Sequence, residues 1–295
     1  MQLSVVSKTI GLLLMVFSLT QIPPLLIDFI YAEGEYLSFV ISFVLTLIGG
    51  FSLWWPYRNI KKDFHLRDGV LIVVCFWLVL SLFGTLPFLL TESINDLTFS
   101  GAFFESMSGL TTTGATVLSQ LDELPKSILF YRQQLQWLGG MGIIVLAVAV
   151  LPLLGVGGME LYHAESSGIS KDRLTPKLRH TAIALWKIYV CLTALCAIGY
   201  FLSGMTLFDA IGHSFSTVAI GGFSTHDGSI GYFNSLSVEV IAMFFMFLAG
   251  INFSLHFVAW NNRSLMNYLK DSEFKVYTLI LVIAAIIVLI FLSIN

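Results

Sequence analysis

The sequence has little charge. Asp, Glu, Lys and Arg make up 11% of its 295 residues, and 57% are hydrophobic. Soluble globular domains carry about 25% charged residues, so this composition excludes an ordinary soluble fold. Because a bilayer offers the backbone no water, a chain this apolar satisfies its own N–H and C=O groups. We therefore predict an all-α polytopic membrane protein in a lipid bilayer. The net charge of −3 gives no reason to expect a nucleic-acid partner.

Cysteine is also scarce, with only Cys75, Cys191 and Cys196 in the whole chain. All three fall inside apolar stretches, where a thiol behaves as a small apolar side chain. Their spacing indicates neither a disulfide framework nor a metal site.

Residues arranged for catalysis are lacking as well. His163, Glu165 and His180 lie in one polar loop without the spacing of a zinc or hydrolase site. The glycine-rich residues 155–159 follow an apolar stretch and precede no βαβ unit, so they fail as a phosphate-binding loop. An intramembrane enzyme would need ionisable groups that converge at one depth. We expect neither enzymatic activity, catalytic residues nor a cofactor.

Long apolar stretches dominate the sequence. A helix needs roughly 20 residues to cross a hydrocarbon core of about 30 Å. Apolar stretches of about this length or longer occupy residues 3–30, 36–55, 69–90, 127–151, 181–203, 235–260 and 276–294. Shorter amphiphilic stretches occupy residues 97–108 and 207–218. The first long stretch exceeds the apolar part of a signal peptide, so we expect a retained helix with a kink or break near Pro23-Pro24.

Basic residues mark one side of the membrane. They cluster between the long stretches, at Arg58, Lys61, Lys62, Arg67, Lys171, Arg173, Lys177, Arg179, Arg263, Lys270 and Lys275. By the positive-inside rule these loops are cytoplasmic. The N-terminus is therefore predicted to be cytoplasmic, and the crossings alternate from there.

Acidic residues collect on the opposite, outer side. They are Asp28, Glu33, Glu35, Glu92, Asp96, Asp122, Glu123, Asp209, Asp227 and Glu239. One explanation is that acids are left outside because cations are kept inside. Another is that a negative mouth raises the local concentration of cations. The two explanations are compatible.

A polar stretch, residues 108–116 (SGLTTTGAT), interrupts the apolar pattern. Non-helical backbone is tolerated at membrane depth only where protein buries it or where it lines a water-filled path. Short Thr/Gly segments can present carbonyl oxygens to an ion, and a ring of carbonyls replaces the hydration shell of potassium in cation filters. Taken alone, the stretch is also compatible with a tight exposed turn.

A second copy of the pattern favours a filter. Residues 102–108 align with residues 210–216, and without a gap Gly114 aligns with Gly222. Each copy follows a long apolar stretch and a short amphiphilic stretch, which we expect to form a pore helix, and precedes another long stretch. A turn has no reason to recur in that setting. The predicted ion-binding filter residues are Thr111, Thr112, Thr113, Gly114, Ala219, Ile220, Gly221 and Gly222.

Several other residues have two readings. Glu105 and His213 occupy equivalent pore-helix positions. For Glu105, a hydrogen-bonded support behind the filter and a direct ion contact both stay open, whereas His213 is expected to be packed and hydrogen-bonded. Asn252 and His256 are four residues apart, hence on one helix face, where they line a wet path or make interhelical contacts. Residues 139–142 (GGMG) offer small side chains for close helix packing.

Three motifs resemble the Trk/Ktr/HKT potassium-transporter family: residues 103–116 (FFESMSGLTTTGAT), 136–142 (QWLGGMG) and 219–225 (AIGGFST). Within it, the chain is similar from end to end to the membrane subunits of bacterial Trk potassium-uptake systems. The resemblance implies a potassium channel or symporter subunit in the bacterial inner membrane. It also implies a homodimer and a cytosolic nucleotide-binding regulatory subunit on the inner loops. Four pore repeats would surround one pathway, with Gly114 and Gly222 as filter glycines.

The chain departs from that pattern in its number of repeats. We expect two leading helices and a cytoplasmic loop in residues 1–66, a first pore repeat in 67–154, a cytoplasmic loop in 155–180, a second pore repeat in 181–262 and the start of a third in 263–295. Two filter segments cannot encircle an ion. We therefore expect a fragment of a longer protein in preference to a pore built from two chains. The alternative function is that of a truncated, non-conducting membrane scaffold.

Overall fold

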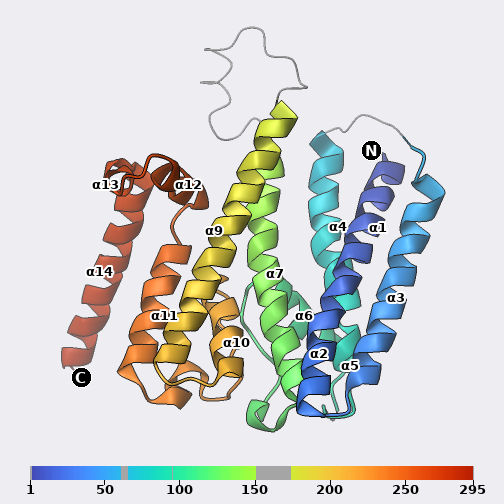
Figure 1. Ribbon diagram of the computed structural model, residues 1–295, viewed down its shortest axis with the longest axis horizontal. Helices are drawn as coiled ribbons and strands as arrows, with labels where there is room; N and C mark the ends of the chain where they lie inside the picture. Colours follow the sequence, from blue (N-terminus) through green and yellow to red (C-terminus); the bar gives the residue numbers. More distant parts are fainter. Residues whose placement is uncertain (1, 61–65, 95, 151–173, 295) are drawn as a thin grey trace.

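The computed structural model describes residues 2–60, 66–94, 96–150 and 174–294. Within these ranges the regular structure is helical (Figure 1), which confirms the predicted all-α fold. The helices are α1 (Leu3–Ser18), α2 (Ile22–Tyr31), α3 (Tyr36–Trp54), α4 (Leu66–Gly84), α5 (Leu86–Leu90), α6 (Phe99–Leu110), α7 (Lys126–Val150), α9 (Leu174–Leu202), α10 (Leu207–Val218), α11 (Leu236–Ala249), α12 (Phe253–Asn261), α13 (Met266–Lys270) and α14 (Ser272–Ile294). Short 3-10 turns cover Leu19–Gln21, Trp55–Tyr57, Leu121–Glu123 and Ser229–Phe233.

The helices form a multi-pass membrane bundle. Among the described helices, five spans are long and apolar enough to cross a membrane, and the bent pair α11 and α12 makes a sixth if it counts as one span. The spans expose many aliphatic and aromatic side chains, as a surface in contact with lipid requires. The two ends of the chain lie at opposite ends of the bundle (Figure 1).

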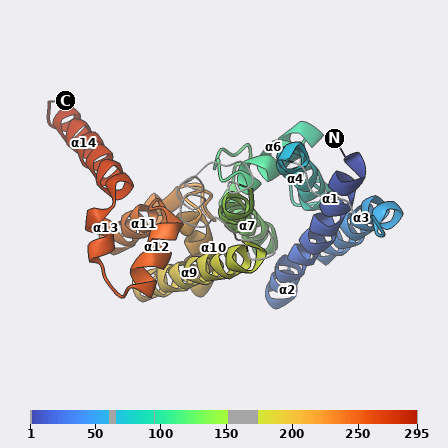
Figure 2. The same ribbon diagram turned by 90° about the horizontal axis from the view of Figure 1, so that it is seen from above.

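Helix α7 stands between the N-terminal helices and the helices α9, α10 and α11 (Figure 2), and it takes part in a hydrophobic core on each side. One core joins α7 to the N-terminal helices and includes Leu14, Phe39 and Tyr131. The other joins it to α9, α10 and α11, with Trp137 packed beside Tyr189. Helix α7 also contacts both α6 and α10. It is therefore the element that positions the two predicted pore helices relative to each other.

Glycines in α7 allow this close approach. A Cβ atom at Gly139 would lie 1.8 Å from the carbonyl oxygen of Leu110, at the end of α6. A Cβ atom at Gly140 would lie 2.7 Å from the hydroxyl of Tyr189 in α9. The close packing predicted for residues 139–142 is confirmed at these two positions.

The predicted break in the first span is confirmed. Helix α1 passes into a 3-10 turn over Leu19–Gln21, and α2 begins at Ile22. Pro23 and Pro24 then occupy the first turn of α2, where the N–H that proline lacks has no helical acceptor.

The uninterrupted helix predicted over residues 235–260 is wrong. Helices α11 and α12 meet at an angle of 86°. Asn252 is not helical, and its side chain caps the first turn of α12. The ring of His256 lies 2.8 Å from the hydroxyl of Tyr268 and 3.0 Å from the carbonyl oxygen of Leu248, which also accepts a hydrogen bond of 3.2 Å from the N–H of Ile251. Asn252 and His256 therefore do not share one helix face.

Contacts with α14 (Ser272–Ile294) explain where the break falls. A Cβ atom at Gly250 would lie 2.2 Å from the hydroxyl of Tyr277, so only glycine admits this ring. The same hydroxyl donates a hydrogen bond of 3.3 Å to the carbonyl of Phe247. The side-chain amide of Asn252 also donates to Glu273 at 3.0 Å.

Helix α9 begins earlier than predicted. It starts at Leu174, inside the range 155–180 expected to be a loop and before the expected start of the second repeat at residue 181. Pro176 lies in its first turn, where proline is tolerated and its fixed φ favours helix initiation.

Candidate functional site

Helices α6 and α10 are built alike. Each has 12 residues and begins with a threonine cap. Thr98 Oγ1 accepts a hydrogen bond of 3.2 Å from the N–H of Gly101, and Thr206 Oγ1 accepts one of 3.1 Å from the N–H of Asp209. The two caps are 108 positions apart, the same offset as Gly114 and Gly222. The internal sequence repeat is therefore also a structural repeat.

Residues 111–114 and 219–222, here called candidate filter segments 1 and 2, follow these helices. In segment 1, φ is 54° at Thr112 and 75° at Gly114; in segment 2 it is 52° at Ile220 and 85° at Gly222. The residues before and between them have negative φ. When residues with positive φ alternate with residues with negative φ, successive carbonyl groups point toward one side of the chain. Positive φ at a β-branched residue is an outlier that surrounding structure must hold in place.

The amide groups of both segments bond back to their pore helices. The N–H groups of Thr111, Thr112 and Thr113 donate to the last turn of α6 at 2.8, 3.0 and 2.9 Å. The equivalent N–H groups of segment 2 donate to the last turn of α10 at 3.1, 3.1 and 2.8 Å. Within the described part of the chain, no group donates to the carbonyl oxygens of either segment. These oxygens are free to face a cation.

The two candidate filter segments lie side by side. A Cβ atom at Gly114 would lie 1.9 Å from the carbonyl oxygen of Gly221. By contrast, a Cβ atom at Gly222 would meet no described atom within 4 Å. The tertiary structure thus brings together two segments that the sequence separates by more than 100 residues.

A side chain of each predicted pore helix, α6 and α10, supports the residues that follow the candidate filter segment. The fully buried carboxylate of Glu105 accepts hydrogen bonds from the Thr116 hydroxyl at 3.0 Å and the N–H of Val117 at 3.1 Å. In the second repeat, Nε2 of His213 lies 2.9 Å from the hydroxyl of Ser224. Of the two roles considered for Glu105, the structure favours support from behind. The packed, hydrogen-bonded His213 is confirmed.

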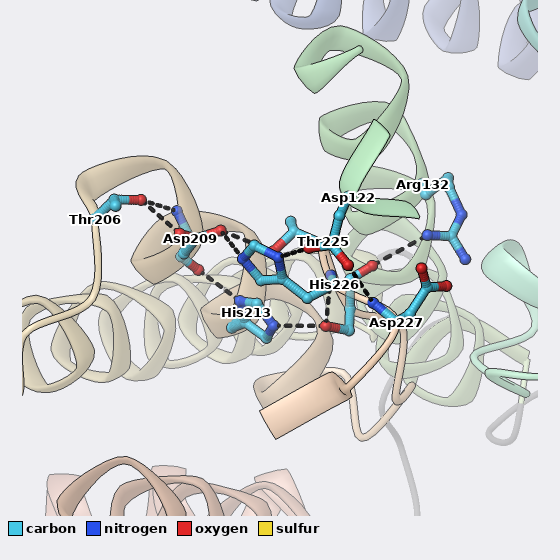
Figure 3. Close-up of polar contacts among 9 residues, drawn as sticks. Asp122, Arg132, Thr206, Asp209, His213, Thr225, His226 and Asp227 are labelled. Atoms are coloured by element: carbon cyan, nitrogen blue, oxygen red, sulfur yellow. Dashed lines mark hydrogen bonds and ion pairs between the residues drawn. The ribbon is translucent and has the colours of Figure 1, made fainter. Parts of the chain in front are cut away.

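Arg132 in α7, which is fully buried, joins the two braces. Its Nε donates to Glu105 at 2.8 Å, and its Nη2 donates to the Thr116 hydroxyl at 3.1 Å. Its Nη1 donates to the carbonyl of Ser224 at 3.1 Å. Figure 3 shows Arg132 and His213 on opposite sides of the segment that carries Thr225 and His226.

The sequence analysis assigned no role to Arg132, although this residue lies inside the apolar stretch 127–151. An arginine inside an apolar stretch needs a buried partner. The signal was therefore present, because Glu105 is the acid inside a neighbouring pore helix. Sequence alone does not reveal that the two side chains meet.

Gln136, one helical turn further along α7, supports segment 2. Its Oε1 accepts a hydrogen bond of 3.0 Å from the N–H of Phe223. A Cβ atom at Gly221 would lie 2.4 Å from the side-chain amide of Gln136. Segment 2 is therefore packed directly against α7.

A cluster outside the candidate filter segments connects the two loops that follow these segments. Nδ1 of His226 is hydrogen-bonded to Asp122, and its ring stacks on Tyr232 with centroids 3.6 Å apart. Its Nε2 lies 3.2 Å from the carboxylate of Asp209, without hydrogen-bond geometry. Asp227 accepts a hydrogen bond of 2.9 Å from the loop that carries Asp122. Figure 3 shows His226 together with Asp122, Asp209 and Asp227.

Several of the acids predicted to lie on the outer side have structural partners. Glu33 accepts hydrogen bonds from the first N–H groups of α7, those of Lys126 at 2.7 Å and Ser127 at 3.0 Å. Asp28 accepts one of 2.8 Å from the N–H of Glu35. These carboxylates cap loops and helix ends while still contributing negative charge on that side.

The hydrogen bond with His226 holds the pKa of Asp122 below its ordinary value. We expect His226→Gln to raise that pKa. The sign follows from linkage: a carboxylate with a lowered pKa stabilises the folded state above its ordinary pKa of about 3.9, and this contribution is lost as pH falls through the lowered value. Carbon-13 NMR titration of labelled aspartate, assigned with Asp122→Asn, measures the shift. The same pKa for Asp122 in the parent and the variant would contradict the assignment.

Most of the remaining sequence candidates lie outside the part of the chain that the structure describes. Residues 155–159, His163 and Glu165 lie outside the described residues, and only the backbone of His180 is described, within α9. Among the described residues, no three His, Cys, Asp or Glu side chains are grouped so that they could hold a metal ion. The carbonyl oxygens of candidate filter segments 1 and 2 remain the predicted cation ligands.

Comparison with known proteins agrees with this architecture. Residues 36–295 match the family model TrkH, described as cation transport protein. The Trk system potassium uptake protein TrkH of Halomonas elongata is 54% identical over 282 residues, covering 95% of this chain and 58% of that protein. The protein of the same name from Escherichia coli K12 is 53% identical over 278 residues, with 94% and 57% covered.

A solved structure has the same fold. The crystal structure of the potassium transporter TrkH from Vibrio parahaemolyticus matches with a TM-score of 0.84 and 48% sequence identity. The match covers 96% of this chain and 57% of that one. The chain thus spans somewhat more than half the length of the relatives it matches.

Proposed function

Because the chain belongs to the TrkH family of cation transport proteins, a transport family and not an enzyme family, we propose that it supplies two segments of a potassium-selective filter. In the complete protein, this filter carries potassium into the cell. The observation that carries the proposal is the recurrence, 108 residues apart, of alternating φ signs and free carbonyls at residues 111–114 and 219–222.

The physical mechanism needs only the backbone. Carbonyl oxygens held toward one side replace the water molecules around a potassium ion. The conformation is held because the N–H groups are already bonded to α6 and α10. An inside-negative potential of 100 mV gives a monovalent cation about 2.3 kcal/mol. At about 1.4 kcal/mol per tenfold change, that drives roughly fiftyfold accumulation without a cofactor.

The assembly is part of the same proposal. The relatives are named as members of a Trk system, in keeping with a homodimer of membrane subunits and a cytosolic nucleotide-binding regulatory subunit. Basic loops between the spans favour a cytoplasmic N-terminus in the inner membrane of a bacterium. A truncated, non-conducting scaffold is the outcome that the following experiment distinguishes.

The test is growth of potassium-uptake-deficient bacteria at limiting potassium. One strain receives residues 1–295. A second receives a hybrid protein, in which residues 1–295 continue into the part of the Vibrio parahaemolyticus relative that follows the matched region. Each is compared with its Gly114→Asp variant at equal membrane levels. We expect the hybrid protein to restore growth and the variant to lose it. If the hybrid reaches the membrane without restoring growth, or if the Gly114→Asp variant restores growth equally well, the filter proposal is wrong.

A further inference from the structure

Arg132 contacts the residues that directly follow both candidate filter segments. Thr116 follows segment 1 by two residues, and Ser224 follows segment 2 by two residues. The guanidinium donates to both, at 3.1 Å each. Its centre also lies 4.4 Å from the ring centroid of Phe223. Together with the bond to Glu105, these contacts use all three guanidinium nitrogens.

These contacts require the planar, forked set of donors of a guanidinium group and not merely a positive charge. Arginine presents donors in a rigid plane, so three acceptors on three chain segments can be held at fixed mutual distances. Lysine would still neutralise Glu105, but a compact ammonium on a flexible stem cannot hold Thr116 and Ser224 apart in the same way. At the 108-residue offset of the two repeats, Arg132 aligns with Val240, whose side chain has no hydrogen-bond donor.

We propose that Arg132 is a positioning residue for ion selectivity, which sets the spacing between the two filter segments through Thr116 and Ser224. The inference rests on the proposed filter function. A cage of carbonyls discriminates between cations through its size and the arrangement of its dipoles. A less fixed spacing between segments 1 and 2 therefore changes the selectivity for potassium over sodium more than it changes insertion into the membrane.

The test measures the potassium-to-sodium permeability ratio of the hybrid protein in liposomes. We expect Arg132→Lys to reach the membrane and to conduct, while the ratio falls by about tenfold or more, the loss expected from one charged hydrogen bond. Tyr131→Phe is the matched control. Tyr131 is equally buried and adjacent on α7, but its hydroxyl donates to Gly84 at 3.0 Å and touches neither filter segment nor the residues that follow them.

The outcomes separate three cases. An unchanged ratio in Arg132→Lys, or an equal fall in Tyr131→Phe, overturns the positioning role. If Arg132→Lys fails to fold, the neutral pair Glu105→Gln with Arg132→Gln is measured, and selectivity equal to that of the parent protein overturns it. If the parent hybrid itself shows no flux that Gly114→Asp abolishes, the filter proposal has failed before Arg132 is in question.

Discussion

Gly114→Ala is expected to destabilise the 295-residue chain far more than Gly222→Ala. A Cβ atom at Gly114 would lie 1.9 Å from the carbonyl oxygen of Gly221, a backbone atom with no rotamer by which to move away. At Gly222 a Cβ atom would meet no described atom within 4 Å. Both positions have positive φ, so either alanine also carries about 1–2 kcal/mol of backbone strain.

The expected loss of stability is therefore about 2–5 kcal/mol for Gly114→Ala, the sum of strain and overpacking. For Gly222→Ala it is about 1–2 kcal/mol, from strain alone. Thermal unfolding of the purified chain in detergent measures the difference. Equal destabilisation by the two alanines would contradict the side-by-side placement of the segments. In the hybrid protein, where the proposed pore places a third segment beside Gly222, both variants should abolish potassium flux.

The second large effect is expected at the ion pair of Glu105 and Arg132. Both side chains are fully buried, with Nε and Oε1 at 2.8 Å. Glu105→Gln removes the counter-charge that is hydrogen-bonded to the guanidinium, and breaking a buried pair in this way costs about 3–5 kcal/mol. Removing both charges avoids that penalty. The double variant Glu105→Gln with Arg132→Gln should therefore be more stable than Glu105→Gln alone.

A double-mutant cycle on detergent-solubilised protein measures this coupling. Glu239→Gln is the control, because Glu239 is an exposed glutamate in the first turn of α11 and its replacement should change stability by no more than about 0.5 kcal/mol. Strictly additive losses in the double variant would mean that the two groups act independently. In that case the ion pair of Glu105 and Arg132 would not be the interaction that links the two repeats.

Several features could be predicted from the sequence because local chemistry decides them. The apolar stretches fold as helices since the bilayer leaves backbone groups no other partner. The repeat identified residues 111–114 and 219–222 because Gly114 and Gly222 recur at one spacing. Pro23-Pro24 marked the break in the first span because proline limits where a helix can start. The use of those segments as a filter stays a prediction.

Other features depend on contacts between residues far apart in the sequence. In the sequence, residues 235–260 look like one ordinary helix. The break between α11 and α12 forms where the ring of Tyr277 occupies the space beside Gly250. Similarly, His226 pairs with Asp122 across more than 100 residues. No local pattern encodes such pairings.

The sequence by itself therefore determined the membrane class, the helical fold and the position of two repeated segments, because hydrophobicity and glycine spacing act within a few residues. Only the tertiary structure decided that Gly114 packs against Gly221, that Glu105 supports the chain from behind, and that Arg132 spans both repeats. The physical reason is that a buried charge must find its partner in space. Which residue that partner is depends on how α7 (Lys126–Val150) packs between the two halves.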